Sequence, residues 1–546
     1  MNRWGIAVAL AALVGATAAR SAPDPVAAAF GARESVSDLS MSPDGTKVAF
    51  VASRAGQGGA VYTLALTPDA KAQLVTVVDG KPNRLEGCRW VSNDRLVCTI
   101  YGLVDAPIDL LPFTRIYAID ANGADVKLLS SPEKFFSRGY QLGGGHIIDW
   151  LPDENGSVLI SRNHLPDDHT GSRIGSSESG FGVDWVNTRT LASHAVERPT
   201  ASAADFLSDG RGTVRVMGQM PTDHGGLDRG LIIYSYRKTG SREWLRLGDY
   251  DFREGTGFAP LAVDYGKNVV YGFEKRDGRE ALYSIALDGS MRKDLVFARD
   301  DVDVDGLIRI GRRSRVVGVS FATDARTAVY FDPELAKIST KLAKALGTRS
   351  EIKIVDSNVD ETKLLIFAGS DTDPGLYYVF DRKARDLHRF MVVRPELEGR
   401  TLATMRAVQY PAADGTMVPA YLTLPPGKEN AKGLPAIVLP HGGPASRDEW
   451  GFDWMSQFFA AKGYAVIQPN FRGSAGFGDE WFQKNGFQSW RIAIGDVIDA
   501  GRWLVSQGIA DPKKLGIFGW SYGGYAALQS AVVAPDCSRR SSPWRR

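Results

Sequence analysis

The chain has 546 residues, which is too long for one compact domain, so two or more domains are expected. Hydrophobic residues make up 44% and charged residues 23% of it, as in ordinary folded soluble proteins. The net charge of +2, from 65 basic and 63 acidic residues, gives no reason to expect nucleic acid or an anionic membrane as a partner.

Residues 1–22 have the pattern of a secretory signal peptide. Arg3 supplies the positive start, residues 6–14 form a short apolar run, and Ala16-Thr17-Ala18 fits a cleavage site of small residues. We therefore expect a secreted or periplasmic protein, with a membrane-tethered N-terminus as the alternative. Since no later apolar run reaches about 18 residues, no membrane contact is expected after cleavage.

A unit of about 40 to 50 residues recurs through residues 36–395, the period expected of propeller blades. Its clearest copy is residues 41–50, where Pro43-Asp44-Gly45 builds a tight turn before an alternating strand. Seven units begin near residues 36, 85, 145, 204, 260, 305 and 351. Because a four-stranded sheet cannot bury both faces alone, we expect a seven-bladed β-propeller. An array of β-sandwiches is the alternative, since the third and fourth units are irregular.

Three cysteines occur, and two of them flank a predicted turn. Cys88 and Cys98 stand almost symmetrically about Asn93-Asp94, so a hairpin could bring them close. We nevertheless expect two separate half-buried thiols rather than a disulfide.

The propeller region gives no sign of a metal or cofactor. Its histidines are scattered singly, as structural or solvent-facing histidines are, and no blade carries a metal-ligand pattern. Residues 172–182 are rich in Ser and Gly and are expected to form a long exposed loop.

From about residue 400 the pattern changes to that of an α/β domain. Residues 405–409 and 418–424 are predicted to pair as strands around a turn, and residues 435–439 form a continuous apolar strand typical of a sheet covered on both faces. A helix near 454–462, a strand at 464–468, and a second helix with an apolar stripe through 494–505 follow. Strand 515–518 then runs straight into Gly519-Trp520-Ser521-Tyr522-Gly523.

This pentapeptide is a nucleophile elbow. A G-x-S-x-G turn between a strand and a helix holds the serine in a strained conformation with its hydroxyl exposed. The following helix, expected at 525–533, points its N-terminus at Ser521 and favours the negative charge that develops on attack. Ser521 is therefore the predicted catalytic nucleophile.

A second motif, His441-Gly442-Gly443-Pro444, ends an earlier strand of the same domain. The backbone N–H groups of Gly442 or Gly443, together with that of Tyr522, are the predicted oxyanion hole. In this fold the general base follows the nucleophile in the chain, so His441 is expected to shape its loop rather than act as the base.

These two motifs, together with Asn470-Phe471-Arg472-Gly473-Ser474-Ala475-Gly476-Phe477-Gly478, resemble those of the prolyl oligopeptidase family, in particular its acylaminoacyl-peptidase-like branch. The resemblance implies a β-propeller that restricts access to an α/β-hydrolase domain. It also implies hydrolysis of short peptides through an acyl-enzyme at Ser521, without a cofactor. Arg472 is a candidate to bind a substrate carbonyl or carboxylate, and holding its own loop is the alternative.

The chain departs from the family after Ser521. The family places its acid and its histidine base after the nucleophile, but no histidine follows Ser521 here and Asp536 is the single acid. We therefore expect a partial hydrolase domain over residues 400–536, incomplete at its C-terminus, with an unpaired edge on strand 515–518. Residues 537–546, with four arginines and no strand pattern, are expected to be an out-of-frame tail; a natural basic tail is the alternative.

Three functions remain open at this point. The first is a serine peptidase acting on oligopeptides, inactive in this form for lack of the triad Asp and His. The second is an ester hydrolase, since the elbow alone does not separate amides from esters. The third is a non-catalytic propeller that binds a protein or peptide. The propeller region has no adjacent Glu-Glu pair to capture a peptide amino terminus, which slightly disfavours a dipeptidyl peptidase; isolated acids such as Glu178 or Glu274 are the alternative for that role. Homo-oligomerisation and scissile-bond preference stay open.

Overall fold

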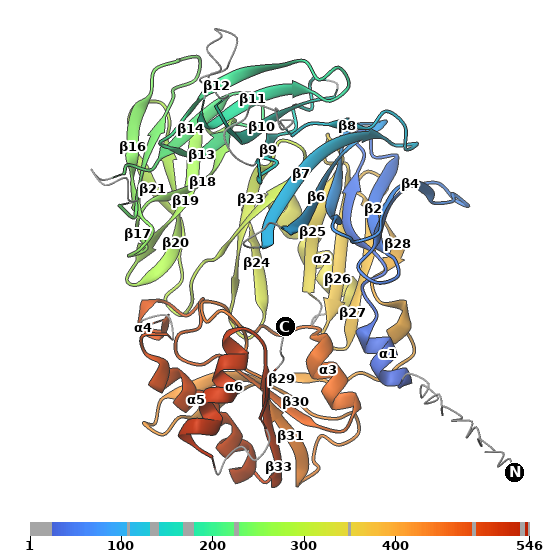
Figure 1. Cartoon of the computed structure of the whole chain (residues 1–546), viewed down its shortest axis with the longest axis vertical. Coiled ribbons are helices and arrows are strands. Elements are labelled where there is room, and N and C mark those ends of the chain that lie inside the picture. The colour runs from blue at the N-terminus through green and yellow to red at the C-terminus, as the bar shows by residue number, and fades with distance from the viewer. Residues whose placement is uncertain are drawn as a thin grey trace, which may run out of the picture.

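A computed structural model describes residues 24–105, 110–130, 141–154, 156–166, 179–222, 229–347, 351–482, 487–535 and 541–543. A β-propeller and a smaller α/β domain lie one beside the other, with the chain entering and leaving the propeller on the side of the α/β domain (Figure 1). The predicted signal peptide lies outside the described residues, as does most of the predicted loop at 172–182. The last residues of that predicted loop are not a loop, because strand β11 begins at Gly180.

Seven antiparallel sheets form the propeller, so the seven-bladed prediction is confirmed. The first three blades comprise β1 (Ser37–Met41), β2 (Lys47–Ser53), β3 (Gly59–Ala65) and β4 (Gln73–Val78); β5 (Arg84–Ser92), β6 (Arg95–Asp105), β7 (Leu110–Asp120) and β8 (Lys127–Leu128); and β9 (His146–Asp149), β10 (Ser157–His164), β11 (Gly180–Asn187) and β12 (Ser193–Thr200).

The other four blades comprise β13 (Ala203–Ser208), β14 (Val214–Gln219), β15 (Leu231–Tyr236), β16 (Leu245–Asp251) and β17 (Thr256–Gly257); β18 (Ala259–Asp264), β19 (Val269–Arg276), β20 (Arg279–Ala286) and β21 (Lys293–Phe297); β22 (Gly306–Ile310), β23 (Arg315–Ala322) and β24 (Arg326–Tyr330); and β25 (Glu351–Ser357), β26 (Lys363–Ser370), β27 (Asp373–Asp381) and β28 (Asp386–Val392). The first and last blades close the ring by packing, with Leu39 and Met41 buried against Leu365 and Val379.

Blade 6 differs from the predicted four-strand unit. It has three strands, and helix α2 (Pro333–Leu346) follows them and packs on blade 7 through buried Leu335 and Leu342. The Asp332 carboxylate caps this helix by accepting hydrogen bonds from the N–H groups of Glu334 and Leu335. The cap and Pro333 at the first turn are local signals that the repeat pattern obscured.

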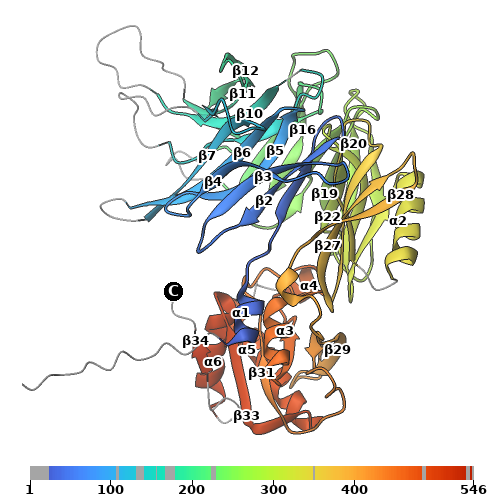
Figure 2. The same cartoon turned by 90° about the vertical axis from the view of Figure 1, so that its right-hand side faces the viewer.

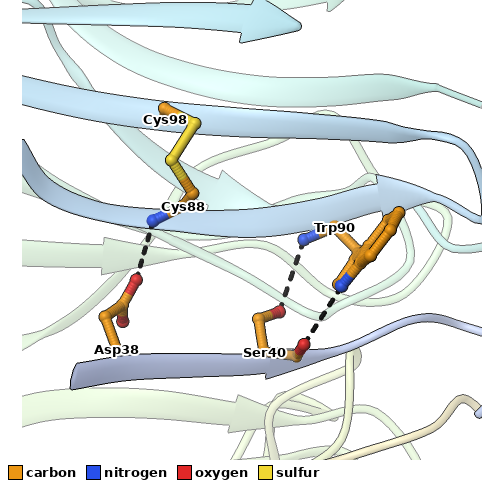
Figure 3. The surroundings of a disulfide bond; sticks show 5 residues. All are labelled: Asp38, Ser40, Cys88, Trp90 and Cys98. Carbon is orange, nitrogen blue, oxygen red and sulfur yellow. Dashed lines mark hydrogen bonds between the residues drawn. A yellow bond between two sulfur atoms is a disulfide. The ribbon is translucent and has the colours of Figure 1, made fainter. Parts of the chain in front are cut away.

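The two cysteines of blade 2 form a disulfide, so the prediction of two separate thiols is wrong (Figure 3). Cys88 on β5 lies directly opposite Cys98 on β6, and both side chains are fully buried. The Asp38 carboxylate accepts a hydrogen bond from the Cys88 N–H (2.7 Å), and the Trp90 indole donates to the Ser40 carbonyl (3.0 Å). The disulfide therefore lies where blade 2 packs on blade 1.

Loss of the disulfide is expected to destabilise the propeller. Closing a loop of about 10 residues restricts the unfolded chain and is worth about 2–3 kcal/mol. The Cys88→Ser, Cys98→Ser variant should therefore unfold at lower urea concentration than the wild-type chain, and dithiothreitol should lower the midpoint of the wild type alone. A Cys537→Ser variant is the matched control. Equal midpoints for the double variant and the wild type would contradict the expectation.

The α/β domain contains one sheet with the strand order β29-β30-β32-β31-β33-β34. Its strands are β29 (Met405–Pro411), β30 (Met417–Thr423), β31 (Leu434–Val438), β32 (Ala465–Pro469), β33 (Ala510–Gly519) and β34 (Ser541–Pro543). Its helices are α3 (Trp454–Ala461), α4 (Asp479–Phe482), α5 (Trp490–Ser506) and α6 (Tyr522–Val533), and the 3₁₀ turn η1 (Pro395–Leu397) links it to the propeller. Strands β31, β32 and β33 are parallel. β31 buries the continuous apolar run predicted for a sheet covered on both faces, and β32 is fully buried beside it.

Two features of this domain were not predicted. Helix α1 (Pro25–Gly31) precedes the propeller in sequence but packs on α3, where Phe30 contacts Phe458 (ring centroids 6.2 Å apart) (Figure 2). Strand β34 pairs in parallel with β33, with Ile517 opposite Ser541. The predicted unpaired edge of strand 515–518 is therefore wrong over residues 517–518, because the segment expected to lack strand structure supplies a backbone partner.

The α/β domain contacts one face of the propeller, at the turns between the second and third strands of blades 5, 6 and 7. The contacts join Asp479 N–H to Gly278 O (2.8 Å), Arg447 Nη2 to Thr323 O (3.0 Å), and Gln457 Nε2 to Asp371 O (2.8 Å). We call this the near face. In an antiparallel sheet the turns between first and second strands lie at the opposite end, and they make up the far face. Within the described part of the chain, no helix is long and apolar enough to cross a membrane.

Candidate active site

Ser521 occupies the turn between strand β33 and helix α6. Its backbone has φ 53° and ψ −128°, a region that L-residues rarely adopt and that costs about 1–3 kcal/mol. The side chain is exposed, and among the described residues its hydroxyl makes no hydrogen bond. The turn therefore presents the hydroxyl to solvent at the N-terminus of α6, where the first N–H groups of a helix point outward.

The two glycines of the elbow are required by close contacts. A Cβ on Gly519 would lie 2.6 Å from the backbone carbon and oxygen of Gly523. A Cβ on Gly523 would lie 2.3 Å from the carbonyl oxygen of Pro440, at the end of the strand that carries the second motif. Gly519 therefore lets the turn close on itself, whereas Gly523 lets the start of α6 approach the neighbouring loop.

That neighbouring loop contains the two glycines predicted to bind an oxyanion. A Cβ on Gly442 would lie 3.4 Å from the Ser521 Cβ and 3.9 Å from its Oγ, so the Gly442 backbone borders the nucleophile. Gly443 has φ +118°, which only glycine adopts readily. Tyr522 is the first residue of α6, and its ring is buried against Phe471 and Tyr525. The structure thus brings Ser521, Gly442 and Tyr522 together, with Gly443 beside them in sequence.

His441 is buried, and both of its ring nitrogens are engaged. Nδ1 donates to the Gly442 carbonyl (2.7 Å), Nε2 lies 2.8 Å from the Ser474 hydroxyl, and the ring stacks on Phe471 with centroids 4.4 Å apart. Burial lowers the pKa of His441 to about 4, so the ring is neutral at pH 7. These contacts hold residues 441–444, here called the oxyanion loop, on the loop that follows β32. This is the role expected of a residue that shapes its loop.

The neutral state of His441 makes the stability of the folded chain depend on pH, which can be tested. Because its folded pKa is below its unfolded value, the unfolded state takes up the proton first and stability falls as the pH drops from about 6.5 to about 4. His441→Gln removes the titrating group, so the unfolding free energy lost between pH 6.5 and pH 4 should shrink by about 2–3 kcal/mol. Urea unfolding at both pH values measures it, with the exposed His388→Gln as control. If wild type and His441→Gln lose the same unfolding free energy over this pH range, the lowered pKa of His441 is contradicted.

Arg472 is held by two acids of its own domain, which favours the alternative that it holds its loop, and substrate binding stays a prediction. Its Nε and Nη2 donate to the two carboxylate oxygens of Asp496 on α5 (3.0 and 2.6 Å), and its Nη1 donates to Asp414 (2.6 Å). The Arg472 N–H also donates to Asp496 (2.9 Å). With every guanidinium nitrogen engaged, Arg472 holds its loop on α5 and on the β29–β30 turn, which was the alternative.

Comparison with known proteins places this geometry in a family. Residues 450–537, which include the elbow, match the model of the prolyl oligopeptidase family. Dipeptidyl aminopeptidase BIII of Pseudoxanthomonas mexicana is 28% identical over 434 residues, which cover 77% of this chain and 58% of that protein. Dipeptidyl peptidase family member 6 of Caenorhabditis elegans is 32% identical over 287 residues, covering 47% of this chain and 39% of that protein.

These matches support a serine peptidase of the prolyl oligopeptidase family. The chain spans roughly half the length of the curated relatives it matches, 58% and 39%. A solved structure of prolyl oligopeptidase B from Galerina marginata, bound to a 25mer macrocyclization substrate, has the same fold, with a TM-score of 0.64 and 15% identity. The alignment covers 95% of this chain and 73% of that one. The acylaminoacyl-peptidase-like branch stays a prediction.

Two residues around the family's motifs escaped the sequence analysis. Asp496 anchors Arg472, and its side chain is fully buried, which raises its pKa against the opposing effect of the guanidinium. Its position between Ile494 and Val497 on the apolar stripe of α5 was the available signal, because an unpaired acid is rarely buried. Ser474 contacts His441, but a serine in a glycine-rich loop carries no such signal.

Asp448 is a further buried acid, in the loop that leads from Gly443 to α3. Burial and the neighbouring Asp453 raise its pKa to about 8, so its carboxyl holds a proton at neutral pH. Its backbone N–H donates to Asn470 (2.8 Å), which ties the oxyanion loop to the loop after β32 a second time. Among the described residues, no group of three or more metal-ligating side chains could hold a metal ion.

Proposed function

We propose that this chain carries the nucleophile and the oxyanion hole of a serine peptidase site. An oligopeptide substrate would acylate Ser521 at this site. The observation that carries the proposal is the exposed Ser521 hydroxyl, held at positive φ against the Gly442 backbone, in a chain of the prolyl oligopeptidase family. The names of the relatives, dipeptidyl aminopeptidase and dipeptidyl peptidase, favour peptides over simple esters as substrates.

In the proposed reaction the Ser521 oxygen attacks the scissile carbonyl carbon, and its proton passes to a base. The carbonyl oxygen becomes an oxyanion that accepts hydrogen bonds from the Tyr522 N–H and from a Gly442 or Gly443 N–H. Collapse of this intermediate expels the amine and leaves an acyl-enzyme, which water hydrolyses. Among the described residues His441 is turned to Ser474 and Gly442, so it does not serve as the base.

Because Ser521 is exposed and a serine hydroxyl is a weak nucleophile without a base, added imidazole should restore its acylation. We expect release of nitrophenol from p-nitrophenyl acetate to rise with imidazole concentration more steeply for this chain than for its Ser521→Ala variant. The rate measured with the variant gives the reaction of imidazole with the ester in solution, which is subtracted from the rate of the wild-type chain.

Competition distinguishes the candidate substrates. Short peptides should slow the imidazole-dependent acylation of Ser521 more than simple alkyl esters do, and an N-acetylated peptide compared with a free one separates acylaminoacyl from dipeptidyl preference. Competition by alkyl esters alone would indicate an ester hydrolase. Identical rates for the chain and for Ser521→Ala would leave a non-catalytic propeller.

Export from the cytoplasm is part of the proposal. A buried Cys88–Cys98 disulfide is expected in an oxidising compartment, which supports a secreted or periplasmic location for a chain whose first 22 residues resemble a signal peptide. Fractionation of cells that express the tagged chain tests it, and recovery in the cytoplasm with free thiols at both positions would contradict it.

A further inference from the structure

The turn between β22 and β23, residues 311–314 of blade 6, contacts blades that are not its neighbours in the ring. The turn joins a first strand to a second strand and so lies on the far face of the propeller, away from the α/β domain. Blades 5 and 7 flank blade 6. Contacts from this turn to blades 1, 3 and 4 therefore require it to reach over the central axis.

Arg312 reaches blade 1 and blade 3. Its side chain is buried, and Nη2 donates to the Ser40 hydroxyl (2.9 Å) and to the Met41 carbonyl of blade 1. Asp356 of blade 7 lies 3.5 Å away, and the guanidinium carbon lies 5.8 Å from the ring centre of Trp150 in blade 3. Arg312 therefore lies among the inner strands of three blades.

Arg313 reaches blades 3 and 4. Its Nη2 donates to both carboxylate oxygens of Asp153 in blade 3 (2.7 and 2.8 Å), and blade 3 stands three places from blade 6 in the seven-membered ring. The Arg313 carbonyl oxygen lies 2.5 Å from the position that a Cβ on Gly210 of blade 4 would take. Since blade 3 is on the opposite side of the ring, the turn spans the far mouth of the central channel.

A cavity of about 340 Å³ lies on the near side of this turn, between blades 2 and 3 and bordered by Asp38 of blade 1. Its polar lining includes Asp38, Glu86, Arg89 and His146, and Trp150 closes the end that lies against Arg312. The propeller thus has open space between its blades that reaches Trp150, the residue against which Arg312 lies.

We propose that Arg312 and Arg313 form a plug that closes the propeller channel at its far face and makes the interior a blind chamber. Ligands then enter and leave through the near face, which the α/β domain partly covers. The plug goes beyond the proposed peptidase reaction, because it concerns the route into the propeller and holds whether or not Ser521 is acylated.

Thiol labelling beneath the plug tests the proposal. In a Cys537→Ser background, Trp150→Cys places a thiol directly under Arg312. N-ethylmaleimide should label this thiol, whereas ubiquitin bearing one maleimide on a short linker should not, because a folded carrier cannot enter the chamber. Adding Arg312→Ala and Arg313→Ala should raise the rate of labelling by the carrier at least about tenfold, as expected when a closed route becomes an open one.

The matched control is Arg246→Ala, which removes an exposed arginine that pairs with Asp249 in blade 4 and should leave the carrier's rate unchanged. Rapid labelling by the carrier with both plug arginines present would overturn the proposal. An unchanged rate after their removal, in a variant that keeps its circular dichroism spectrum, would do the same.

Cross-linking tests the plug without removing Arg312. In the same background, Arg313→Cys combined with Asp153→Cys should be joined by bismaleimidoethane within one chain, because the two wild-type side chains meet across the mouth. Arg313→Cys combined with Asp69→Cys, in the β3–β4 turn of blade 1, should give no product. Failure of the first pair to cross-link in the folded chain would show that the turn does not span the mouth.

Discussion

Replacing Gly523 by alanine is expected to slow the imidazole-dependent acylation of Ser521 about 100-fold, the cost of displacing a reacting group by about 1 Å. The new Cβ would lie 2.3 Å from the Pro440 carbonyl and 3.2 Å from that of His441, and both are backbone atoms that cannot swing aside. The start of α6 must therefore move away from the loop that holds Gly442. Overpacking of this kind also destabilises the fold by about 1–3 kcal/mol.

Gly495→Ala is the matched control for this substitution. Gly495 lies inside α5, where a Cβ meets nothing within 4 Å, so alanine should leave acylation unchanged and stabilise the helix by up to about 1 kcal/mol. Nitrophenol release measures the acylation rate of both variants, and urea unfolding measures their free energy of unfolding. If Gly523→Ala acylates Ser521 as fast as Gly495→Ala does, the elbow and the oxyanion loop do not act as one site.

Replacing Arg472 by methionine is expected to destabilise the α/β domain by about 3–5 kcal/mol, because it leaves a buried carboxylate without its partner. The Asp496 side chain is fully buried and receives three hydrogen bonds from Arg472. Methionine keeps the length of the side chain but provides no donor, and only the backbone N–H remains to Asp496. Urea unfolding, followed by tryptophan fluorescence, measures the loss.

Two further variants separate the buried pair from a general charge effect. Arg472→Met combined with Asp496→Leu removes both charges and should recover much of the stability. Arg246→Met breaks an exposed pair with Asp249 and should cost less than about 1 kcal/mol. If Arg472→Met costs no more than Arg246→Met, Arg472 does not anchor the loop after β32, and a role in substrate binding is favoured instead.

The sequence predicted those parts of the fold that depend on neighbouring residues. The seven blades follow from turns such as Pro43-Asp44-Gly45, where the Asp44 carboxylate accepts from the Thr46 N–H (2.9 Å) and Gly45 has φ +71°. The elbow follows from Gly519 and Gly523 in the same way. These signals act within a few residues, so they can be found without knowing what packs against them.

The features that the sequence analysis missed depend on residues distant along the chain. Whether Cys88 bonds to Cys98 depends on strand register, because a shift by one residue would put the two side chains on opposite faces. Helix α1 packs on the α/β domain through contacts such as Asp24 with Lys462, which no local pattern indicates. The loop-holding role of Arg472 became visible only when Asp496, on helix α5, was placed beside it.

Reaction with a fluorophosphonate is the most direct test of Ser521 as a nucleophile at an oxyanion site. The chain should acquire one adduct, located on Ser521 by peptide mass spectrometry, at a rate that rises with added imidazole because an external base can reach the exposed hydroxyl. Ser521→Ala should acquire none. An adduct on another residue, or no adduct at any imidazole concentration in a chain that retains its fold, would contradict the assignment.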